Sequence, residues 1–214
     1  YLRDVIKLNE QNHNFRIFGP DEAMSNRLNQ VFEVTDRQWL MPIGEKDEHV
    51  NPYGRVLDSY LSEHFAEGAL EGYLLTGRHG LIHSYESFIR VVDSMIGIHA
   101  KWLKMTKELP WRAPISSLNI IETSHIWQQD HNGYTHQEPG FINHILNKER
   151  DIIDIYLPYD TNSLIYTVDK CLKSKNMINT IIASKHDRPQ WLNYEESISH
   201  CAKGIGLWVV ACVA

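Results

Sequence analysis

The sequence predicts an α/β fold in which helices flank a largely parallel β-sheet. Two kinds of segment alternate along the chain: continuous apolar runs rich in β-branched residues, and longer segments whose apolar residues recur at helical spacing. Continuous apolar runs are typical of strands that are buried on both faces, as they are in parallel sheets. Helices that alternate with such strands indicate the same fold class. Because ligands of these sheets bind beyond the carboxyl ends of the strands, the residues after each run are the first candidates for a functional site.

The first half of the chain contains two predicted helices and one predicted strand. Apolar residues recur at helical spacing over 24–32, shortly after a Gly-Pro pair, and again over 88–102. A continuous apolar run over 118–121 predicts a buried strand.

The second half continues the alternation of strands and helices. Three more apolar runs predict strands, at 152–157, 178–183 and 205–213. We expect Asp160 or Thr161 to cap a helix, because a side-chain oxygen can accept from the free N–H groups of a first helical turn. We expect Asn193 to cap a last helix, with Glu196 at the capping-box position.

Composition and charge argue against several classes of function. The chain has 214 residues, of which 43% are hydrophobic and 22% charged, enough for one sizeable core or at most two small ones. No apolar run approaches the ~20 residues that a membrane-spanning helix needs, and no signal peptide is visible. A net charge of −6 without a block of Lys or Arg argues against a nucleic-acid surface. The 3 widely spaced cysteines fit a reducing, cytoplasmic compartment better than disulfides.

The segment 123–140 follows a predicted strand and is the densest in polar, aromatic and histidine residues. Gly133 and the Pro139-Gly140 pair predict turns within it. Its histidines could hold a metal, which would favour a metal hydrolase, but their spacing matches none of the compact zinc motifs and no cysteine joins them. We therefore expect no metal site here, and the segment alone is most simply interpreted as a surface loop.

The same segment, SHIWQQDHNGYTHQEPG at 124–140, closely resembles the signature of the thiamine-diphosphate-dependent phosphoketolases. Eight further stretches resemble that family in the same order along the chain. They are GPDE and SNRL within 19–28, LSEH at 61–64, LEGYLLTGRHG at 70–80, SYESF at 84–88, HAKW at 99–102, IIASK at 181–185 and CAKGIG at 201–206. Ordered matches over essentially the whole chain are far more specific than one short motif.

The resemblance implies the activity of an aldehyde-lyase. Phosphoketolases cleave xylulose 5-phosphate, and often fructose 6-phosphate, with inorganic phosphate. The products are acetyl phosphate and either glyceraldehyde 3-phosphate or erythrose 4-phosphate. The resemblance further implies a transketolase-like fold that binds thiamine diphosphate, with this chain as the single middle, pyrimidine-binding domain over 1–214. Residues 1–15 are a candidate linker from a preceding domain.

The expected partners of this domain follow from the same resemblance. The family holds magnesium and the cofactor's diphosphate in an amino-terminal domain, whose Gly-Asp-Gly motif this sequence lacks. The cofactor of related enzymes lies between domains of two subunits, which implies a homodimer. We therefore expect the chain alone to be inactive, and we expect neither nucleic acid nor a membrane among its partners.

The resemblance assigns ten candidate site residues to three roles. Catalysis is assigned to Glu63, which would activate the cofactor, and to His136. Further contacts with the cofactor are assigned to Tyr85, Phe88, Gln129 and Asn132. The phosphate of the substrate is assigned to Ser25, Arg27, His131 and Lys185. These three roles imply that the pyrimidine and the sugar phosphate lie at different places in the site.

Simpler interpretations of some of these residues remain open. Glu63 alone would be an ordinary carboxylate in a first helical turn, where the helix dipole favours it, and Glu67 and Glu71 are expected to be ordinary helix residues. Phe88 could belong to the core. On a regular helix, Ser25 and Arg27 would point ~200° apart, so they could not both face one phosphate.

Two alternative functions are compatible with the same fold. The first is transketolase proper, against which the 129–136 segment argues because it matches phosphoketolases instead. The second is a non-catalytic domain that serves only in assembly.

Overall fold

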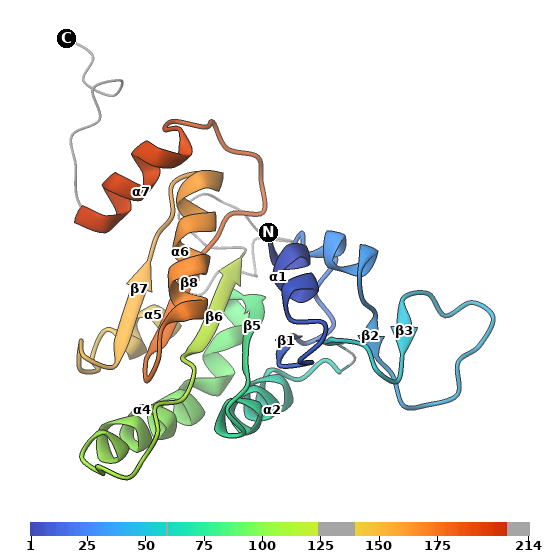
Figure 1. Ribbon diagram of the computed structural model, residues 1–214, viewed down its shortest axis with the longest axis horizontal. Coiled ribbons are helices and arrows are strands. Elements are labelled where there is room, and N and C mark those ends of the chain that lie inside the picture. Colours follow the sequence, from blue (N-terminus) through green and yellow to red (C-terminus); the bar gives the residue numbers. More distant parts are fainter. Residues whose placement is uncertain (59, 124–139, 205–214) are drawn as a thin grey trace.

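A parallel β-sheet organises the chain, and helices cover both of its faces. The computed structural model describes residues 1–58, 60–123 and 140–204 (Figure 1). The strands of these residues are β1 (Phe15–Phe18), β2 (Arg37–Gln38), β3 (Val50–Asn51), β4 (Val56–Leu57), β5 (His79–Tyr85), β6 (Leu118–Thr123), β7 (Ile153–Tyr156) and β8 (Ile178–Ile182). They pair in the order β3-β2-β4-β1-β5-β6-β8-β7, and each pairing is parallel.

The helices divide between the two faces of the sheet. The α-helices are α1 (Leu2–Leu8), α2 (Glu63–Leu75), α3 (Glu86–Ile89), α4 (Asp93–Lys107), α5 (Gly140–Ile145), α6 (Thr161–Lys173) and α7 (Tyr194–Lys203), and two 3₁₀ helices are η1 (Asn29–Glu33) and η2 (Arg90–Val92). Buried residues of α2 to α5 form one apolar cluster with the sheet, whereas those of α1, η1 and α6 form a second cluster. The fold is therefore a three-layer α/β arrangement with one core on each face of the sheet.

Alternation along the central strands supplies both cores. On β5, Leu81 belongs to the cluster on the α6 side and Ile82 to the cluster on the α2 side. On β6, Ile121 belongs to the cluster on the α6 side and Ile120 to the cluster on the α2 side. Successive side chains of a strand point to opposite faces, so strands covered on both faces must be apolar at nearly every position.

Most of the predicted elements are confirmed. The apolar runs at 118–121, 152–157 and 178–183 form β6, β7 and β8. Asp160 caps α6 by accepting from the backbone N–H of Ser163, and Asn193 caps α7 in a capping box with Glu196. The expected strand at 205–213 lies outside the described residues.

The helix predicted over 24–32 is wrong. Residues 23–27 form a turn, and only the 3₁₀ helix η1 follows it. The reason is that Arg27 adopts a positive φ of 61°, while Glu22 and Ala23 just before the segment donate their N–H groups to the distant carboxylate of Asp58. A left-handed residue ends regular helix formation. The helix predicted over 88–102 forms with an interruption, as α3, η2 and α4.

The start of the chain contributes to the core. Val5 and Ile6 of α1 are buried in the cluster on the α6 side, and the connection of residues 1–15 to a preceding domain stays a prediction. Cys171 and Cys201 are free thiols. Among the described residues, we find no helix with the length and apolar character needed to cross a bilayer.

Candidate functional site

Four of the predicted site residues follow the carboxyl ends of neighbouring parallel strands. Ser25 and Arg27 lie in the turn of residues 19–27 after β1, Tyr85 is the last residue of β5, and Lys185 follows β8. The parallel pairing of β1 with β5, of β5 with β6 and of β6 with β8 puts these ends at one edge of the sheet. This is the edge at which sheets of this kind bind ligands.

Tyr85 connects residues that the sequence assigns to different roles. Its hydroxyl donates to Ser25 Oγ at 2.5 Å, and Lys185 Nζ lies 4.1 Å from the centre of its ring, the distance of a cation–π contact. Its ring centroid is 5.6 Å from that of Phe88. The aromatic and the phosphate-binding candidates are therefore neighbours around Tyr85, whereas the separate places of the pyrimidine and the sugar phosphate stay a prediction.

Arg27 reaches the same place because the 19–27 turn is not helical. Its Nε donates to the backbone oxygen of Lys185 at 3.3 Å. The positive φ of Arg27 changes the direction of its side chain relative to a regular helix. Because the turn is not helical, Ser25 and Arg27 are not held ~200° apart as they would be on a regular helix. Phe88 is half-buried and outside both apolar clusters, so it does not act as a core residue.

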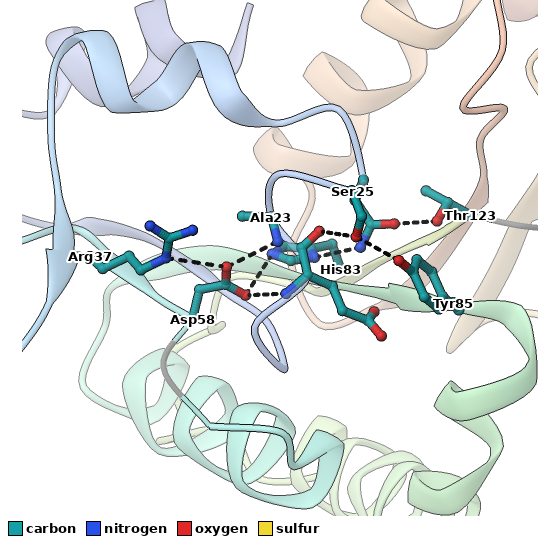
Figure 2. Close-up of polar contacts among 9 residues, drawn as sticks. Ala23, Ser25, Arg37, Asp58, His83, Tyr85 and Thr123 are labelled. Atoms are coloured by element: carbon teal, nitrogen blue, oxygen red, sulfur yellow. Dashed lines mark hydrogen bonds and ion pairs between the residues drawn. The ribbon is translucent and has the colours of Figure 1, made fainter. Parts of the chain in front are cut away.

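Beneath the 19–27 turn, the fully buried carboxylate of Asp58 organises the backbone. It accepts from the N–H groups of Glu22 at 3.0 Å and Ala23 at 2.9 Å. Arg37 Nε lies 3.8 Å from its second oxygen, and His83 Nε2 lies 3.5 Å from its first (Figure 2). Backbone donors and a cation compensate the carboxylate for the water that it loses.

His83 continues this buried network toward the strand ends. Its Nδ1 lies 2.9 Å from Nδ2 of Asn26, whose Oδ1 accepts from the hydroxyl of Thr123. Complete burial lowers the pKa of His83, so the ring is neutral. With Nδ1 accepting from Asn26, the proton lies on Nε2 and faces Asp58. A side chain at Gly19 would meet this ring at 2.2 Å, so glycine is required there.

Two acids lie near the site on neighbouring elements. Glu63 is the first residue of α2, which Ser62 caps by accepting from the backbone N–H of Phe65. Glu22 is buried, and its pKa is raised to about 8, first by burial and then by the negative charge of Glu63, while Lys185 acts in the opposite direction. Glu22 is therefore electrostatically coupled to both a predicted catalytic acid and a predicted phosphate-binding cation.

A cavity of about 730 Å³ lies next to these residues. Its lining includes Arg27 and Lys185, together with Tyr159 and Thr161 around the N-terminus of α6. Its volume is in the range of pockets that hold complete small ligands, about 300–1,000 Å³.

Several predictions fall on residues that the structure does not describe. Gln129, His131, Asn132 and His136 all lie within 124–139, so their assignments stay predictions. In the ranges 1–58, 60–123 and 140–204, no three His, Cys, Asp or Glu residues are arranged to hold a metal ion.

The buried network contains the residues that sequence reasoning missed. Glu22 and Asn26 lie within the matched stretches, but no role was assigned to them, and Asp58 and His83 carried no signal at all. Glu67 and Glu71 also differ from the expectation of ordinary helix residues: Glu67 is fully buried, and Glu71 Oε1 lies 2.8 Å from Nδ1 of His99.

Comparison with known proteins assigns the chain to a family. The model of the family described as D-xylulose 5-phosphate/D-fructose 6-phosphate phosphoketolase matches residues 1–174. Probable phosphoketolases of Clostridium acetobutylicum and Rhodopirellula baltica are 59% and 57% identical over 97% of this chain. The chain spans 26% of the length of each of these relatives.

Solved structures show the same fold at low sequence identity. A transketolase mutant from Pichia stipitis aligns with a TM-score of 0.64 and 14% identity, covering 86% of this chain and 25% of that one. A split-gene transketolase, described as an inactive β4 tetramer, aligns with a TM-score of 0.53 and 10% identity, over 89% of this chain and 51% of that one. The fold is transketolase-like, and by sequence the chain belongs to the phosphoketolase family.

Proposed function

We propose that this chain is the pyrimidine-binding domain of a phosphoketolase that uses thiamine diphosphate. The whole enzyme cleaves xylulose 5-phosphate or fructose 6-phosphate with inorganic phosphate to acetyl phosphate and a shorter aldose phosphate. The observation that carries the proposal is the meeting of Ser25, Phe88 and Lys185 around Tyr85. One residue joins an aromatic surface for a flat ring to a polar, cationic surface for a phosphate.

The residues present fit the pyrimidine end of the cofactor. The rings of Tyr85 and Phe88 supply aromatic surface, and Glu63 supplies a half-buried carboxyl at the start of α2. When bound, thiamine diphosphate supplies an electron sink for cleavage of a carbon–carbon bond next to a ketone. The role of Glu63 is to hold and share a proton at N1′ of the aminopyrimidine, and the role of the aromatic pair is to orient that ring.

The residues on the other side of Tyr85 fit a phosphate group. Arg27 offers a planar guanidinium, Lys185 a point charge, and Ser25 a hydroxyl. Lys185 is only 8% exposed, so a phosphate beside it would be weakly screened by water. Two cations and a hydroxyl lie together at this edge of the sheet, and this arrangement supports an anionic phosphate rather than a neutral ligand.

The remaining half of the site belongs to other parts of the enzyme. We place magnesium and the cofactor's diphosphate in the amino-terminal domain, and a second subunit beside this one, as a homodimer in the cytoplasm. The chain alone is then expected to show no turnover. Formation of acetyl phosphate by the purified 214-residue chain would refute this division of the site.

Glu63→Gln in the full-length enzyme tests the cofactor assignment. Gln preserves the shape of the side chain but cannot share a proton with N1′, so kcat should fall by at least about 100-fold, the usual contribution of a proton-transferring group. The KM for sugar phosphate should change little, because the sugar does not contact Glu63. Glu108→Gln, at an exposed glutamate just after α4, is the matched control. A near-normal kcat in the Glu63 variant would contradict the assignment.

Lys185→Ala tests the phosphate assignment in the same enzyme. Loss of a charge-assisted bond of roughly 2 kcal/mol should raise the KM for sugar phosphate about thirtyfold. Since Lys185 also lies over Tyr85, a smaller loss of affinity for thiamine diphosphate is expected to accompany it. Lys175→Ala, at an exposed lysine beside β8, should change neither quantity. An effect confined to the cofactor would place the phosphate elsewhere.

A further inference from the structure

The 730 Å³ cavity contains a guanidinium that the family resemblance leaves without a role. The loop of residues 184–188, which follows β8, forms part of its wall, and Arg188 ends this loop. Arg188 is half-buried rather than extended into solvent. It lines the same cavity as Arg27 and Lys185.

Arg27 and Arg188 are held in the same way. Arg27 donates through Nε to the backbone oxygen of Lys185 at 3.3 Å, and Arg188 donates through Nε to Ser184 Oγ at 3.1 Å. Both acceptors are neutral oxygens of the 184–188 loop. Each bond fixes its guanidinium by the inner nitrogen, which leaves the two terminal nitrogens as donors for a ligand.

Among the described residues, neither guanidinium is neutralised by a carboxylate. Within the part of the chain that the structure describes, no Asp or Glu oxygen lies within 4.0 Å of a nitrogen of Arg27 or Arg188. The cavity does contain Asp160 and Asp187. The carboxylate of Asp160 already accepts from backbone N–H groups, whereas Asp187 is exposed and forms no ion pair with the described residues.

Ser184 gives the loop the shape that holds Arg188 in the wall. Its Oγ also accepts from the backbone N–H of His186 at 3.1 Å, so one hydroxyl closes the turn and anchors the guanidinium. A side chain without a hydroxyl at this position would leave Arg188 free to move into solvent. The simpler interpretation, a solvated surface arginine, does not account for this anchoring.

We propose that Arg188 is a second phosphate-binding guanidinium of this cavity, with Ser184 as its positioning residue. The ligand class is a phosphate dianion, either the phosphate of the sugar substrate or the inorganic phosphate that is the second substrate. The inference deepens the proposed function and rests on it for the identity of these two substrates. The fork of donors on a guanidinium suits two oxygens of one phosphate.

The test uses the full-length enzyme with Arg188→Gln, Arg188→Lys and Ser184→Ala. Arg150→Gln is the matched control, because Arg150 is exposed and lies near the start of β7, away from the cavity. The KM for fructose 6-phosphate and the KM for inorganic phosphate are measured separately at constant ionic strength. Arg188→Gln should raise one of them about tenfold with kcat nearly unchanged, and the substrate affected identifies the source of the phosphate.

The two other variants test how the guanidinium of Arg188 binds phosphate and how Ser184 positions it. Arg188→Lys should recover only part of the affinity, because an ammonium lacks the fork, and Ser184→Ala should raise the same KM about threefold. If both KM values in Arg188→Gln equal those of the Arg150 control, the proposal is wrong.

A binding measurement separates this proposal from the proposed function. The increase in Tm caused by inorganic phosphate, relative to chloride at equal ionic strength, is compared between the full-length wild type and Arg188→Gln. If the wild type forms no acetyl phosphate but Arg188→Gln still loses most of this increase, the function fails and the phosphate site stands. If the increase is the same in both proteins, or absent from both, Arg188 binds no phosphate.

Discussion

Two fully buried carboxyl groups near the site, those of Asp58 and Glu122, are in opposite situations. Both side chains are inaccessible to solvent. Asp58 accepts two backbone hydrogen bonds and faces Arg37 and His83. Neither oxygen of Glu122 has a hydrogen-bond partner among the described residues. Burial raises the pKa of Glu122 well above its usual range, and the acids Glu86 and Asp93 raise it further.

The difference shows what each buried polar group contributes. A buried carboxylate with several donors fixes the backbone around it, and here it fixes the turn that carries Ser25 and Arg27. A buried acid without partners must stay neutral, and it loses the hydrogen bonds that water would give it. Glu122 pairs with Ile182 in the sheet, so it occupies a strand position that an apolar residue would fill without this cost.

Asp58→Ala should have the largest effect, because it breaks the buried ion pair and leaves two buried N–H groups without an acceptor. We expect the free energy of unfolding of the chain to fall by about 3–5 kcal/mol, as measured by urea denaturation. Asp58→Asn should lose less, since its amide oxygen still accepts one of the two bonds. A loss below about 1 kcal/mol in the Ala variant would mean that the turn does not depend on Asp58.

The same contrast explains which elements the sequence predicts. The runs that became β6, β7 and β8 contain only one or two polar residues each over 118–121, 152–157 and 178–183, and this pattern is visible locally. The central strand β5 was missed, because His83 and Ser84 interrupt its apolar run. These residues can be buried only because the fold brings partners such as Asn26 and Asp58 to His83. Polar contacts with partners that are distant in the sequence leave no local pattern.

The candidate site was predictable in its residues but not in its arrangement. The family motifs select Ser25, Tyr85 and Lys185, whereas their contacts come from the shape of the 19–27 turn. The apolar spacing of 24–32 is typical of a helix. Nothing local shows that Arg27 will adopt a positive φ, or that Asp58 will accept from the N–H groups of Glu22 and Ala23 just before the segment.

Glu22→Gln should have an intermediate effect, which depends on pH. The folded-state pKa of Glu22 is about 8, above the usual value of 4.5, so folding favours the protonated form. This contribution to stability is fully present below pH 4.5 and is lost as the pH rises through 8. Gln cannot ionise, so between pH 5 and pH 9 the stability of the variant relative to the wild type should rise by up to about 4 kcal/mol. Urea denaturation at pH 5 and pH 9 measures the two differences. Equal pH dependence in both proteins would show that Glu22 titrates normally.

Glu122→Met should have the smallest effect and the opposite sign to Asp58→Ala. Methionine is similar in volume and has no strong polar group, so it removes the unmet hydrogen bonds of the acid and should stabilise the chain by about 1 kcal/mol. Glu122→Gln is the control near pH 4.5, where an amide in the same place keeps two polar groups without partners and should give no gain. Burial raises the pKa of Glu122 in the folded state above the usual value of 4.5, so the wild type loses stability as the pH rises above 4.5. The gain of about 1 kcal/mol therefore applies near pH 4.5 and should grow between pH 5 and pH 7, because methionine does not ionise. Destabilisation by Met at all these pH values would show that Glu122 has a partner, and the contrast with Asp58 would then be lost.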